Sequence, residues 1–507
     1  MRKWYGKKPI NAKIYIVKLD SEKIPPEVLR VSEKLAQGGF EAYVVGGCVR
    51  DLLLKRAPKD WDIATNATPE QVQGLFENTF YTNEFGTVGV VNEEVSDPSL
   101  KVIEVTPYRT EGEYTDARRP ESVAWAKTVE EDLRRRDFTI NAMAYDPKKD
   151  KLLDLFEGQS DLISGHIRAV GEPEERFAED ALRILRAVRI ATELNFAIEE
   201  KTKQALIQAA PQLGKISRER IRDELNRILM SDRPMKGLQL AEGLGLLSYI
   251  MPELAQGIGV EQNQAHSYDV FEHNLRSLQH AADKGWPLEI RLAALLHDVG
   301  KPASRRRSEE KNDWTFHGHE VVGARMTKKI LENLKFSRET AEKVIKLVRW
   351  HMFFSDPEKV TLSAVRRIVS NVGKENIWDL VNLRICDRIG TGRPKEQPFR
   401  LRKYQSMIEQ AMRDPISVGM LAIDGNEVIR ETGEKPGPRI GWILHALLEE
   451  VLEDPSKNTK EYLMSEAVKL TALNDTDLRR VGESGKERRA EEEAEAIKDI
   501  DKKYYVS

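Results

Sequence analysis

Two aspartates, Asp60 and Asp62, constrain this chain more than any other feature because of what precedes them. The run Tyr43-Val-Val-Gly-Gly47 predicts an apolar strand that ends in a glycine turn and opens a helix, and Asp60-Trp-Asp-Ile-Ala-Thr65 predicts a second strand. Residues one apart in a strand project from the same face, so the two carboxylates can share divalent cations. Backbone N–H groups at Gly46 and Gly47 can approach a triphosphate closely. The segment therefore predicts a nucleotidyl-transfer site.

That chemistry calls for more than two carboxylates. Displacing pyrophosphate builds negative charge on the attacking and leaving oxygens, and two metal ions about 3.5 to 4 Å apart stabilise both. Glu104 is the best candidate for a third carboxylate, because the alternating run from Lys101 to Arg109 predicts another strand. A single Asp-x-Asp more often marks a surface loop or a helix cap, so the interpretation depends on the segments that follow.

Two later segments carry groups that suit a nucleotide. Arg134–Met143 combines basic, acidic and amide side chains in one amphipathic stretch. Glu179–Arg186 predicts a continuous helix in which Asp180 and Arg183 are i,i+3 neighbours on one face. A carboxylate acceptor and guanidinium donors at a fixed spacing can mimic the Watson–Crick edge of a base.

With these motifs in this order, the chain resembles the class II tRNA nucleotidyltransferases and bacterial poly(A) polymerases. The resemblance runs from about residue 43 to residue 229 and rests on five motifs: Gly46–Asp51 with Asp60 and Asp62, Arg135–Ala142, the turn from Asp154 to Gly158, Glu179–Arg186, and Ile216–Leu225. It implies transfer of nucleotides from CTP and ATP to the 3′ end of tRNA, without a nucleic-acid template and with Mg²⁺ as cofactor.

The resemblance also implies roles for single residues. Asp60 and Asp62 would bind the metal, assisted by Glu104. The triphosphate would be contacted by Gly46, Gly47 and Arg50. The sugar and phosphates would be held by Arg136, Asp137 and Asn141. The base would be selected by Asp180 and Arg183, with Arg186 and Arg189 in support.

The product depends on residues 109–122, which have no apolar period and predict a mobile loop. Members of the family that add only the two cytidines are similar elsewhere but have this loop shortened. Its presence favours full CCA addition or addition of the terminal adenosine alone. A solvated loop without a role remains an alternative, and so does a poly(A) polymerase, which would share nearly all the same residues.

A second chemistry is indicated in the middle of the chain, where seven of the nine histidines lie between residues 266 and 351. His297 and Asp298 close an apolar helical run, His273 lies earlier and Asp387 lies later. Imidazoles and carboxylates that converge from separate helices suit a divalent transition metal such as manganese, nickel, cobalt or iron.

This order resembles the HD superfamily of metal-dependent phosphohydrolases. The resemblance implies one metal on His273, His297, Asp298 and Asp387, a second on His319 and His351, and a substrate phosphate near Lys301. HD domains fused to such polymerases can be phosphatases, phosphodiesterases or mainly structural, so turnover is left open here. Two competing interpretations are an HD hydrolase whose head only captures RNA, and a nonenzymatic RNA-binding protein.

Composition agrees with an intracellular enzyme. The 507 residues and 40% hydrophobic content predict several domains with real cores. Two cysteines are too few for a disulfide framework, and the absence of a signal-peptide core or membrane-length apolar stretch predicts a cytoplasmic protein with no membrane partner. The net charge of −3 gives no global nucleic-acid signature, so RNA binding has to rest on local basic stretches.

The expected fold class is α+β, a small mixed-sheet head followed by a mostly helical remainder. The predicted organisation is an N-terminal extension at 1–27, the head at 28–156, a helical neck for RNA binding and base selection at 157–256, the HD domain at 257–393, a helical C-terminal region at 394–474, and a charged tail at 475–507, solvated or disordered.

Overall fold

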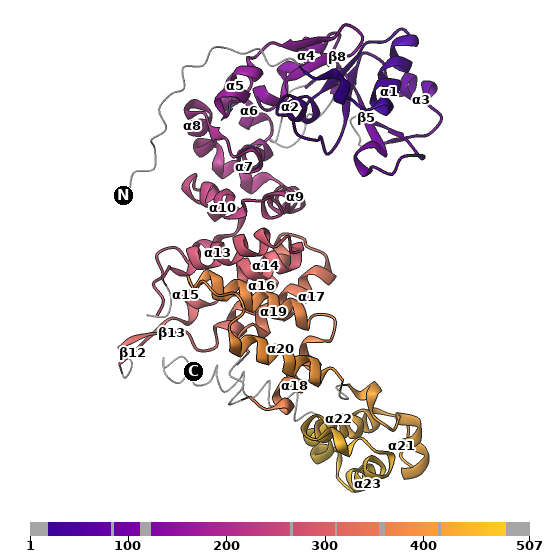
Figure 1. The fold of residues 1–507 in the computed structure, drawn as a ribbon, viewed down its shortest axis with the longest axis vertical. Coiled ribbons are helices and arrows are strands. Elements are labelled where there is room, and N and C mark those ends of the chain that lie inside the picture. The colour runs from indigo at the N-terminus through magenta and orange to yellow at the C-terminus, as the bar shows by residue number, and fades with distance from the viewer. Residues whose placement is uncertain are drawn as a thin grey trace. The chain divides into compact units, whose positions relative to one another are not determined.

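The computed structural model describes residues 19–82, 86–111, 123–263, 267–309, 312–353, 360–413 and 417–482. Most of the N-terminal extension, residues 112–122 of the 109–122 loop, His266 and the tail beyond residue 482 lie outside them. The chain divides into two compact units, one made of residues 1–228 and 240–250, the other of residues 229–239 and 251–507 (Figure 1).

The first unit begins with a seven-stranded mixed sheet. Its strands, in spatial order, are β3 (Thr79–Tyr81), β4 (Val88–Val91), β5 (Val102–Pro107), β2 (Asp62–Thr65), β1 (Ala42–Val45), β8 (Met143–Asp146) and β9 (Lys151–Asp154). Every neighbouring pair is antiparallel except β2 and β5, which run parallel. A mixed-sheet head was predicted, and it is confirmed.

Alternation along β5 explains how the sheet presents functional groups. Ile103 and Val105 are buried, whereas Glu104 between them is only partly buried on the other face. The helices and the short hairpin of the head are α1 (Pro26–Gln37), α2 (Gly47–Leu53), α3 (Pro69–Leu75), α4 (Val129–Arg134), β6 (Arg109–Glu111) and β7 (Val123–Trp125). The face of the sheet that carries Glu104 is therefore left available to polar chemistry.

Helices dominate the rest of the first unit. They are α5 (Gly158–Ser164), α6 (Pro173–Glu179), α7 (Leu182–Leu194), α8 (Glu200–Ala209), α9 (Arg218–Leu229) and α11 (Leu247–Ile250), with a short parallel pair, β10 (His166–Ile167) and β11 (Ala197–Ile198). Helix α10 (Pro234–Gly243) begins in the second unit and ends in the first. α7 is nearly all buried, because apolar residues occupy most of its positions and its arginines are paired with acids.

Within its described residues, the second unit is helical apart from one small hairpin. Its elements are α12 (Pro252–Ala255), α13 (Val270–Asp283), α14 (Leu288–Leu296), α15 (Lys301–Ser304), β12 (Arg306–Ser308), β13 (Asp313–Thr315), α16 (His319–Asn333), α17 (Arg338–Trp350), α18 (Leu362–Val372), α19 (Ile377–Gly390) and α20 (Phe399–Ala411). α13 packs on α14 and α19, and α16 packs on α17. Together with the head, these helices confirm the α+β class.

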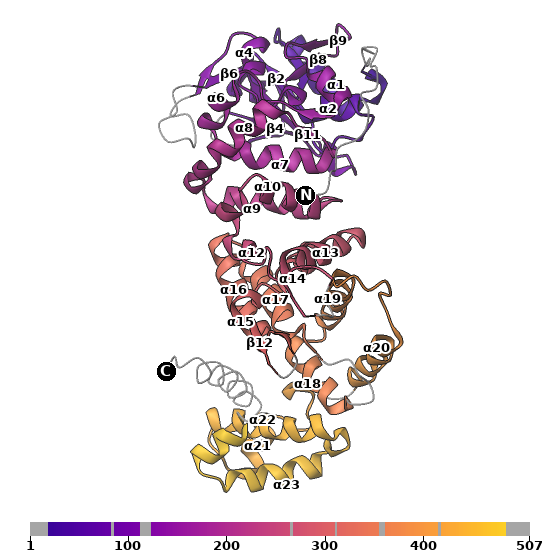
Figure 2. The same ribbon diagram turned by 90° about the vertical axis from the view of Figure 1, so that its left-hand side faces the viewer.

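Three further helices, α21 (Gly425–Thr432), α22 (Pro438–Glu453) and α23 (Lys460–Thr471), bury their own apolar cluster (Figure 2). The chain from residue 475, expected as a solvated helix or disordered tail, is helical as far as residue 482, and Leu478 within it is fully buried in that cluster. An isolated leucine in a charged run gives too weak a period to reveal this contact. Among the described helices, none is long and apolar enough to cross a membrane.

Candidate active site

The glycine turn lies where the sequence predicts it, between β1 and α2. Gly46 has a φ of 81°, in the left-handed region that favours glycine. A Cβ atom at this position would lie 3.1 Å from Nη1 of Arg136 and 3.3 Å from Oδ2 of Asp62. The turn, the Arg136 guanidinium and the Asp62 carboxylate therefore meet at one point.

Carboxylates gather beside this turn. Asp62 opens β2 and is the register partner of Glu104 on the parallel strand β5, so both side chains lie on one face of the sheet. Asp60 was expected in the same strand, but it lies in the exposed bend before β2, because the strand pairing with β1 begins at Asp62. The charge of Asp60 nevertheless acts on both Asp62 and Glu104, because it raises the pKa of each.

The three carboxylates of Asp60, Asp62 and Glu104 repel one another, as the pKa values of Asp62 and Glu104 show. Burial, then the charges of Asp60 and Glu104, raise the pKa of Asp62 to about 7, although Arg136 opposes the shift. Burial and Asp60 also raise the pKa of Glu104. Crowded carboxylates with raised pKa values are characteristic of a site that a divalent cation completes.

Arg136 is held by a residue that the sequence reasoning missed. Asp132 is 1% exposed, and its Oδ2 accepts hydrogen bonds from Nε and Nη2 of Arg136 at 3.3 and 3.0 Å. Its Oδ1 accepts from Nε and Nη2 of Arg135 at 2.9 and 2.5 Å. The i,i+3 and i,i+4 spacing of one acid before two arginines was the signal that could have found it.

Four of the predicted nucleotide-binding residues form a connected chain. Nη1 of Arg50 donates to Oδ1 of Asn141 at 2.8 Å, and Nδ2 of Asn141 donates to Oδ1 of Asp137 at 3.2 Å. Oδ2 of Asp137 lies 2.7 Å from Nη2 of Arg186 on α7. Burial favours protonation of Asp137, but Arg186 holds the pKa of this carboxyl below its usual range. These contacts link α2, which begins at Gly47, to α7.

The predicted base-reading pair does not lie on one continuous helix. α6 ends at Glu179 and α7 begins at Leu182, and Asp180 between them has extended dihedral angles. Oδ1 of Asp180 accepts from the N–H of Leu182 at 3.0 Å, and Oδ2 lies 2.8 Å from Nη2 of Arg220 on α9. The carboxylate satisfies a backbone donor at the start of α7, which favours the helix break that periodicity alone does not show.

The other two arginines of α7 are also held by the protein. Arg183 contacts the Glu179 carboxylate, and its Nη1 and Nη2 donate to the carbonyl oxygens of Arg176 and Arg135, each at 3.0 Å. Arg189 is buried in an ion pair with Glu224 of α9, with 2.6 Å between Nε and Oε2. Arg220 and Glu224 lie in the Ile216–Leu225 motif, but only tertiary structure assigns their partners.

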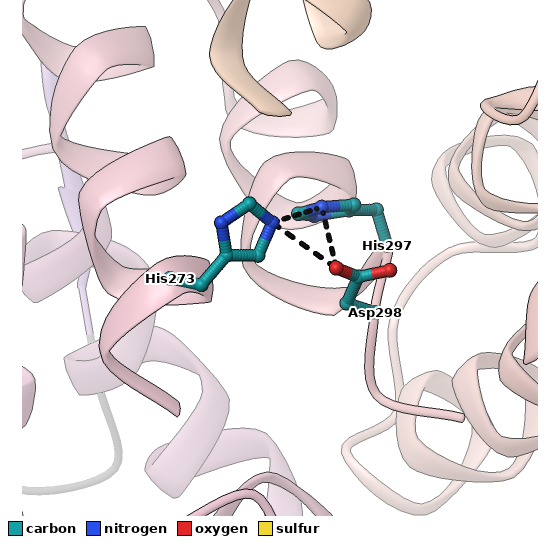
Figure 3. A group of neighbouring side chains, drawn as sticks. All are labelled: His273, His297 and Asp298. Atoms are coloured by element: carbon teal, nitrogen blue, oxygen red, sulfur yellow. Dashed lines mark hydrogen bonds and ion pairs between the residues drawn. The ribbon is translucent and has the colours of Figure 1, made fainter. Parts of the chain in front are cut away.

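A separate polar cluster lies in the second unit, where α13, the turn after α14 and α19 bring together His273, His297, Asp298 and Asp387. Nε2 of His273 lies 2.9 Å from Nε2 of His297, and Oδ2 of Asp298 lies 3.1 and 3.3 Å from these two atoms (Figure 3). Oδ1 of Asp387 lies 3.4 and 3.7 Å from the same nitrogens. Four potential ligand atoms thus surround one point.

The two remaining predicted histidines complete a second group. Nε2 of His319 and Nε2 of His351 lie 3.3 Å apart, and Oδ1 of Asp298 lies 3.2 and 3.6 Å from them. Gly300 allows this approach, because a Cβ there would lie 2.3 Å from the carbonyl oxygen of His319. The two oxygens of Asp298 therefore face two separate histidine pairs.

Hydrogen bonds fix which ring nitrogens face these points. Nδ1 of His319 and Nδ1 of His351 each lie 2.7 Å from a backbone carbonyl oxygen, which can only accept, so Nδ1 carries the proton. In the neutral imidazoles the Nε2 lone pairs then face each other. A cation between the nitrogens would relieve that repulsion, and the two groups of histidine and aspartate can each bind a metal ion.

A cavity of about 450 Å³ opens on this cluster. Its lining includes Asp298, His319 and Asp387 together with four basic side chains, Lys301, Arg384, Arg388 and Arg393. Nζ of Lys301 lies 2.6 Å from Oδ2 of Asp298. Basic side chains around these histidines and carboxylates suit an anionic ligand such as a phosphate ester.

Comparison with known families matches three consecutive parts of the chain. The poly A polymerase head domain matches residues 42–168, the probable RNA and SrmB-binding site of polymerase A matches residues 195–258, and the HD domain matches residues 270–389.

Curated relatives cover most of the chain. The CCA-adding enzyme of Leuconostoc mesenteroides is 33% identical over 81% of this chain and 88% of its own length, and that of Geobacillus stearothermophilus is 34% identical over 86% and 95%. The chain belongs to the CCA-adding enzyme family.

Solved structures agree with this placement in the CCA-adding enzyme family. The crystal structure of the Bacillus stearothermophilus CCA-adding enzyme in complex with CTP has a TM-score of 0.66 and 29% identity, and the match covers 89% of this chain and 98% of that one. A CCA-adding enzyme in complex with ATP, at 22% identity and a TM-score of 0.56 over 90% and 96%, shows the same fold. As a member of this family with a polymerase head, the protein is a nucleotidyltransferase.

Proposed function

We propose that this protein adds CCA, or its terminal adenosine, to the 3′ end of tRNA from CTP and ATP. The observation that carries the proposal is the meeting of Gly46, Arg136 and Asp62 beside Glu104 in a chain whose relatives are CCA-adding enzymes. In each addition the terminal hydroxyl oxygen forms a bond to the α-phosphorus, and the bond from that phosphorus to pyrophosphate breaks. The cytoplasm is the compartment that this proposal assigns, and cell fractionation tests it.

Asp60, Asp62 and Glu104 fit a divalent metal, because their mutual repulsion and the raised pKa of Asp62 call for a compensating cation. Mg²⁺ held there would supply positive charge to the triphosphate and to the attacking oxygen. Arg136, fixed by Asp132, lies beside the glycine turn, and in this proposal it would bind phosphate oxygens. The N-terminal backbone of α2 presents N–H donors to the same phosphates.

Base choice is assigned to Asp180 and Arg183. Cytosine and adenine each present an amino donor beside a ring-nitrogen acceptor, whereas uracil and guanine present a carbonyl oxygen beside an N–H. A carboxylate only accepts and a guanidinium only donates, so the pair matches C and A and mismatches U and G. Arg183 would have to leave the carbonyl oxygens of Arg176 and Arg135 to reach a base.

Labelled incorporation tests this proposal. CTP and ATP are offered separately and together, with Mg²⁺, to tRNA transcripts that end at the discriminator base, after C, and after CC. We expect CCA on the first transcript. Adenosine only on the CC-ended transcript would mean an A-adding enzyme, and long adenosine tails on any RNA would mean a poly(A) polymerase. No incorporation at all would overturn the proposal and favour a head that only captures RNA.

A second activity is favoured by the two histidine groups that share Asp298. We propose that this cluster binds two divalent transition metal ions and hydrolyses a phosphate ester in the adjoining basic cavity. Metal there would activate water and withdraw charge from the ester, while Lys301 and Arg384 contact the phosphate. Release of phosphate or p-nitrophenol from p-nitrophenyl phosphate and its bis ester, with manganese, nickel, cobalt or iron, tests turnover. Metal binding without turnover would mean a structural role.

A further inference from the structure

Both oxygens of the Asp180 carboxylate are engaged by the protein. The backbone N–H of Leu182 donates to Oδ1, and Nη2 of Arg220 lies 2.8 Å from Oδ2. The Asp180 side chain is 20% exposed and that of Arg220 is 29% exposed, so the pair is partly shielded from solvent. A charge-assisted hydrogen bond in such a place fixes the direction in which a carboxylate points.

Arg220 comes from an anchored helix. Ile221 and Leu225 of α9 are 0% and 1% exposed, and Glu224, one turn beyond Arg220, forms the buried ion pair with Arg189 of α7. α9 therefore contacts this region at two points, at Asp180 in the α6–α7 break and at Arg189 within α7. A donor on a helix fixed in this way has little freedom to follow a moving partner.

The orientation of Asp180 matters because selectivity against uracil and guanine depends on repulsion. An acceptor held opposite the carbonyl oxygen of a wrong base leaves two oxygens facing each other without a proton. A carboxylate that can turn away avoids that cost, and the wrong base is then tolerated.

We infer that Arg220 is a positioning residue that sets nucleotide selectivity by holding the Asp180 carboxylate in the direction from which it reads the base. The inference rests on the proposed function, in which Asp180 reads the incoming nucleotide. Arg220 acts through Asp180 and does not itself contact the reacting atoms.

The test compares selectivity in the full-length protein. For each variant, kcat/KM is measured for CTP and UTP on a transcript that ends at the discriminator base, and for ATP and GTP on a CC-ended transcript. We expect Arg220→Ala to lower both selectivity ratios about tenfold, the effect of one lost charge-assisted hydrogen bond on an acceptor's direction. Arg220→Lys, which keeps a donor, is expected to recover part of the loss. A ratio is independent of the fraction of folded protein, so a purely structural defect leaves it unchanged.

A matched control separates this effect from loss of charge near RNA. Arg227 lies seven residues further along α9 and is exposed, so Arg227→Ala removes the same charge from the same helix. Its selectivity ratios are expected to equal those of the parent. Equal losses in the Arg220 and Arg227 variants would overturn the inference.

A double-mutant cycle provides the second test. If Arg220 acts through Asp180, then adding Arg220→Ala to Asp180→Ala causes no further loss of selectivity. Losses that simply add would overturn the inference. If Arg220→Ala does not fold, Arg220→Lys and Arg220→Gln are measured in its place, with a smaller loss for Lys than for Gln expected.

Failure of the inference and failure of the proposed function give different results. A parent protein that adds C and A selectively, with an Arg220→Ala variant that is equally selective, overturns only the inference. A parent protein that incorporates no nucleotide overturns the proposed function, and the inference with it.

Discussion

Asp62 and Glu104 are register partners on two parallel strands, β2 and β5, although they lie 42 positions apart in the chain of 507 residues. They belong to the only parallel pairing in the seven-stranded sheet, within the part of the chain that the structure describes. This pairing adds a third carboxylate to Asp60 and Asp62 at the glycine turn. The charge that results is the physical basis of the first prediction.

Asp62→Ala is expected to lower nucleotide incorporation at least about a hundredfold, because charge stabilisation at the reacting phosphate is lost. Asp60→Ala is expected to do the same. Affinity for tRNA, measured by filter binding, should stay within a few-fold of the parent. Glu77→Ala, which removes an exposed carboxylate from the same head, serves as the control with parental activity. Retained turnover in Asp62→Ala would refute the two-metal assignment.

Arg183→Ala is expected to blur base choice more than it slows incorporation of the correct nucleotide, because the guanidinium supplies the donors opposite the base. The ratio of kcat/KM for CTP over UTP should fall by about tenfold or more. The measurement is single-nucleotide extension with each of the four triphosphates. A variant that still prefers CTP and ATP over UTP and GTP as strongly as the parent contradicts the assignment of Arg183.

Asp298→Ala is expected to abolish metal binding in the second unit, because both histidine groups use this carboxylate. Metal content after manganese loading, measured by mass spectrometry, should fall from about two ions to near zero at these positions. CCA addition should continue, because the carboxylates of the head are unchanged. Asp62→Ala should do the opposite: CCA addition falls, and the histidine cluster keeps its metal content.

His351→Ala is expected to remove one metal ion and leave the other, because His351 belongs only to the group with His319. The remaining ion should still stabilise the fold by about 2.7 kcal/mol at a concentration of 100 Kd. Thermal unfolding with and without manganese, alongside metal content, measures both quantities. Loss of both ions in this variant would mean that the two groups form a single site.

Asp132→Asn is expected to change the acid sensitivity of the head. Burial favours protonation of Asp132, but Arg136 and Arg135 hold its pKa below the usual range, so the unfolded chain binds this proton more readily than the folded one. The ion pairs therefore stabilise the fold above about pH 4, and this contribution is lost as the pH falls through the lowered pKa.

The Asn variant should be less stable than the parent at pH 7, by about 3 kcal/mol for a broken buried pair. Its stability should then decline less steeply than that of the parent as the pH falls below about 4. Urea unfolding at a series of pH values measures both effects. Parallel pH profiles for parent and variant would show that Asp132 is not the titrating group.

Much of the fold was predictable because it is encoded locally. The apolar strand before Gly46, the alternation around Glu104 and the helix that ends at Leu296 all follow from the spacing of neighbouring residues. The helix break at Asp180 was not predictable from the sequence. The Asp180 carboxylate accepts a hydrogen bond from the backbone N–H of Leu182, and this contact leaves the apolar period of the sequence almost unchanged. The burial of Leu478 was missed for a related reason, since it depends on a distant apolar cluster.

The sequence by itself determined which chemical groups this protein has and in which order: a glycine turn, paired aspartates, a guanidinium-rich motif and a series of histidines and aspartates with metal-ligand character. Only the tertiary structure decided which of them meet. The register of β2 on β5, the ion pair of Arg220 with Asp180 and the contacts of Asp298 with His273 and His319 join residues that lie 21 to 42 positions apart in the chain. Such contacts depend on how whole elements pack, and no local period in a sequence specifies that packing.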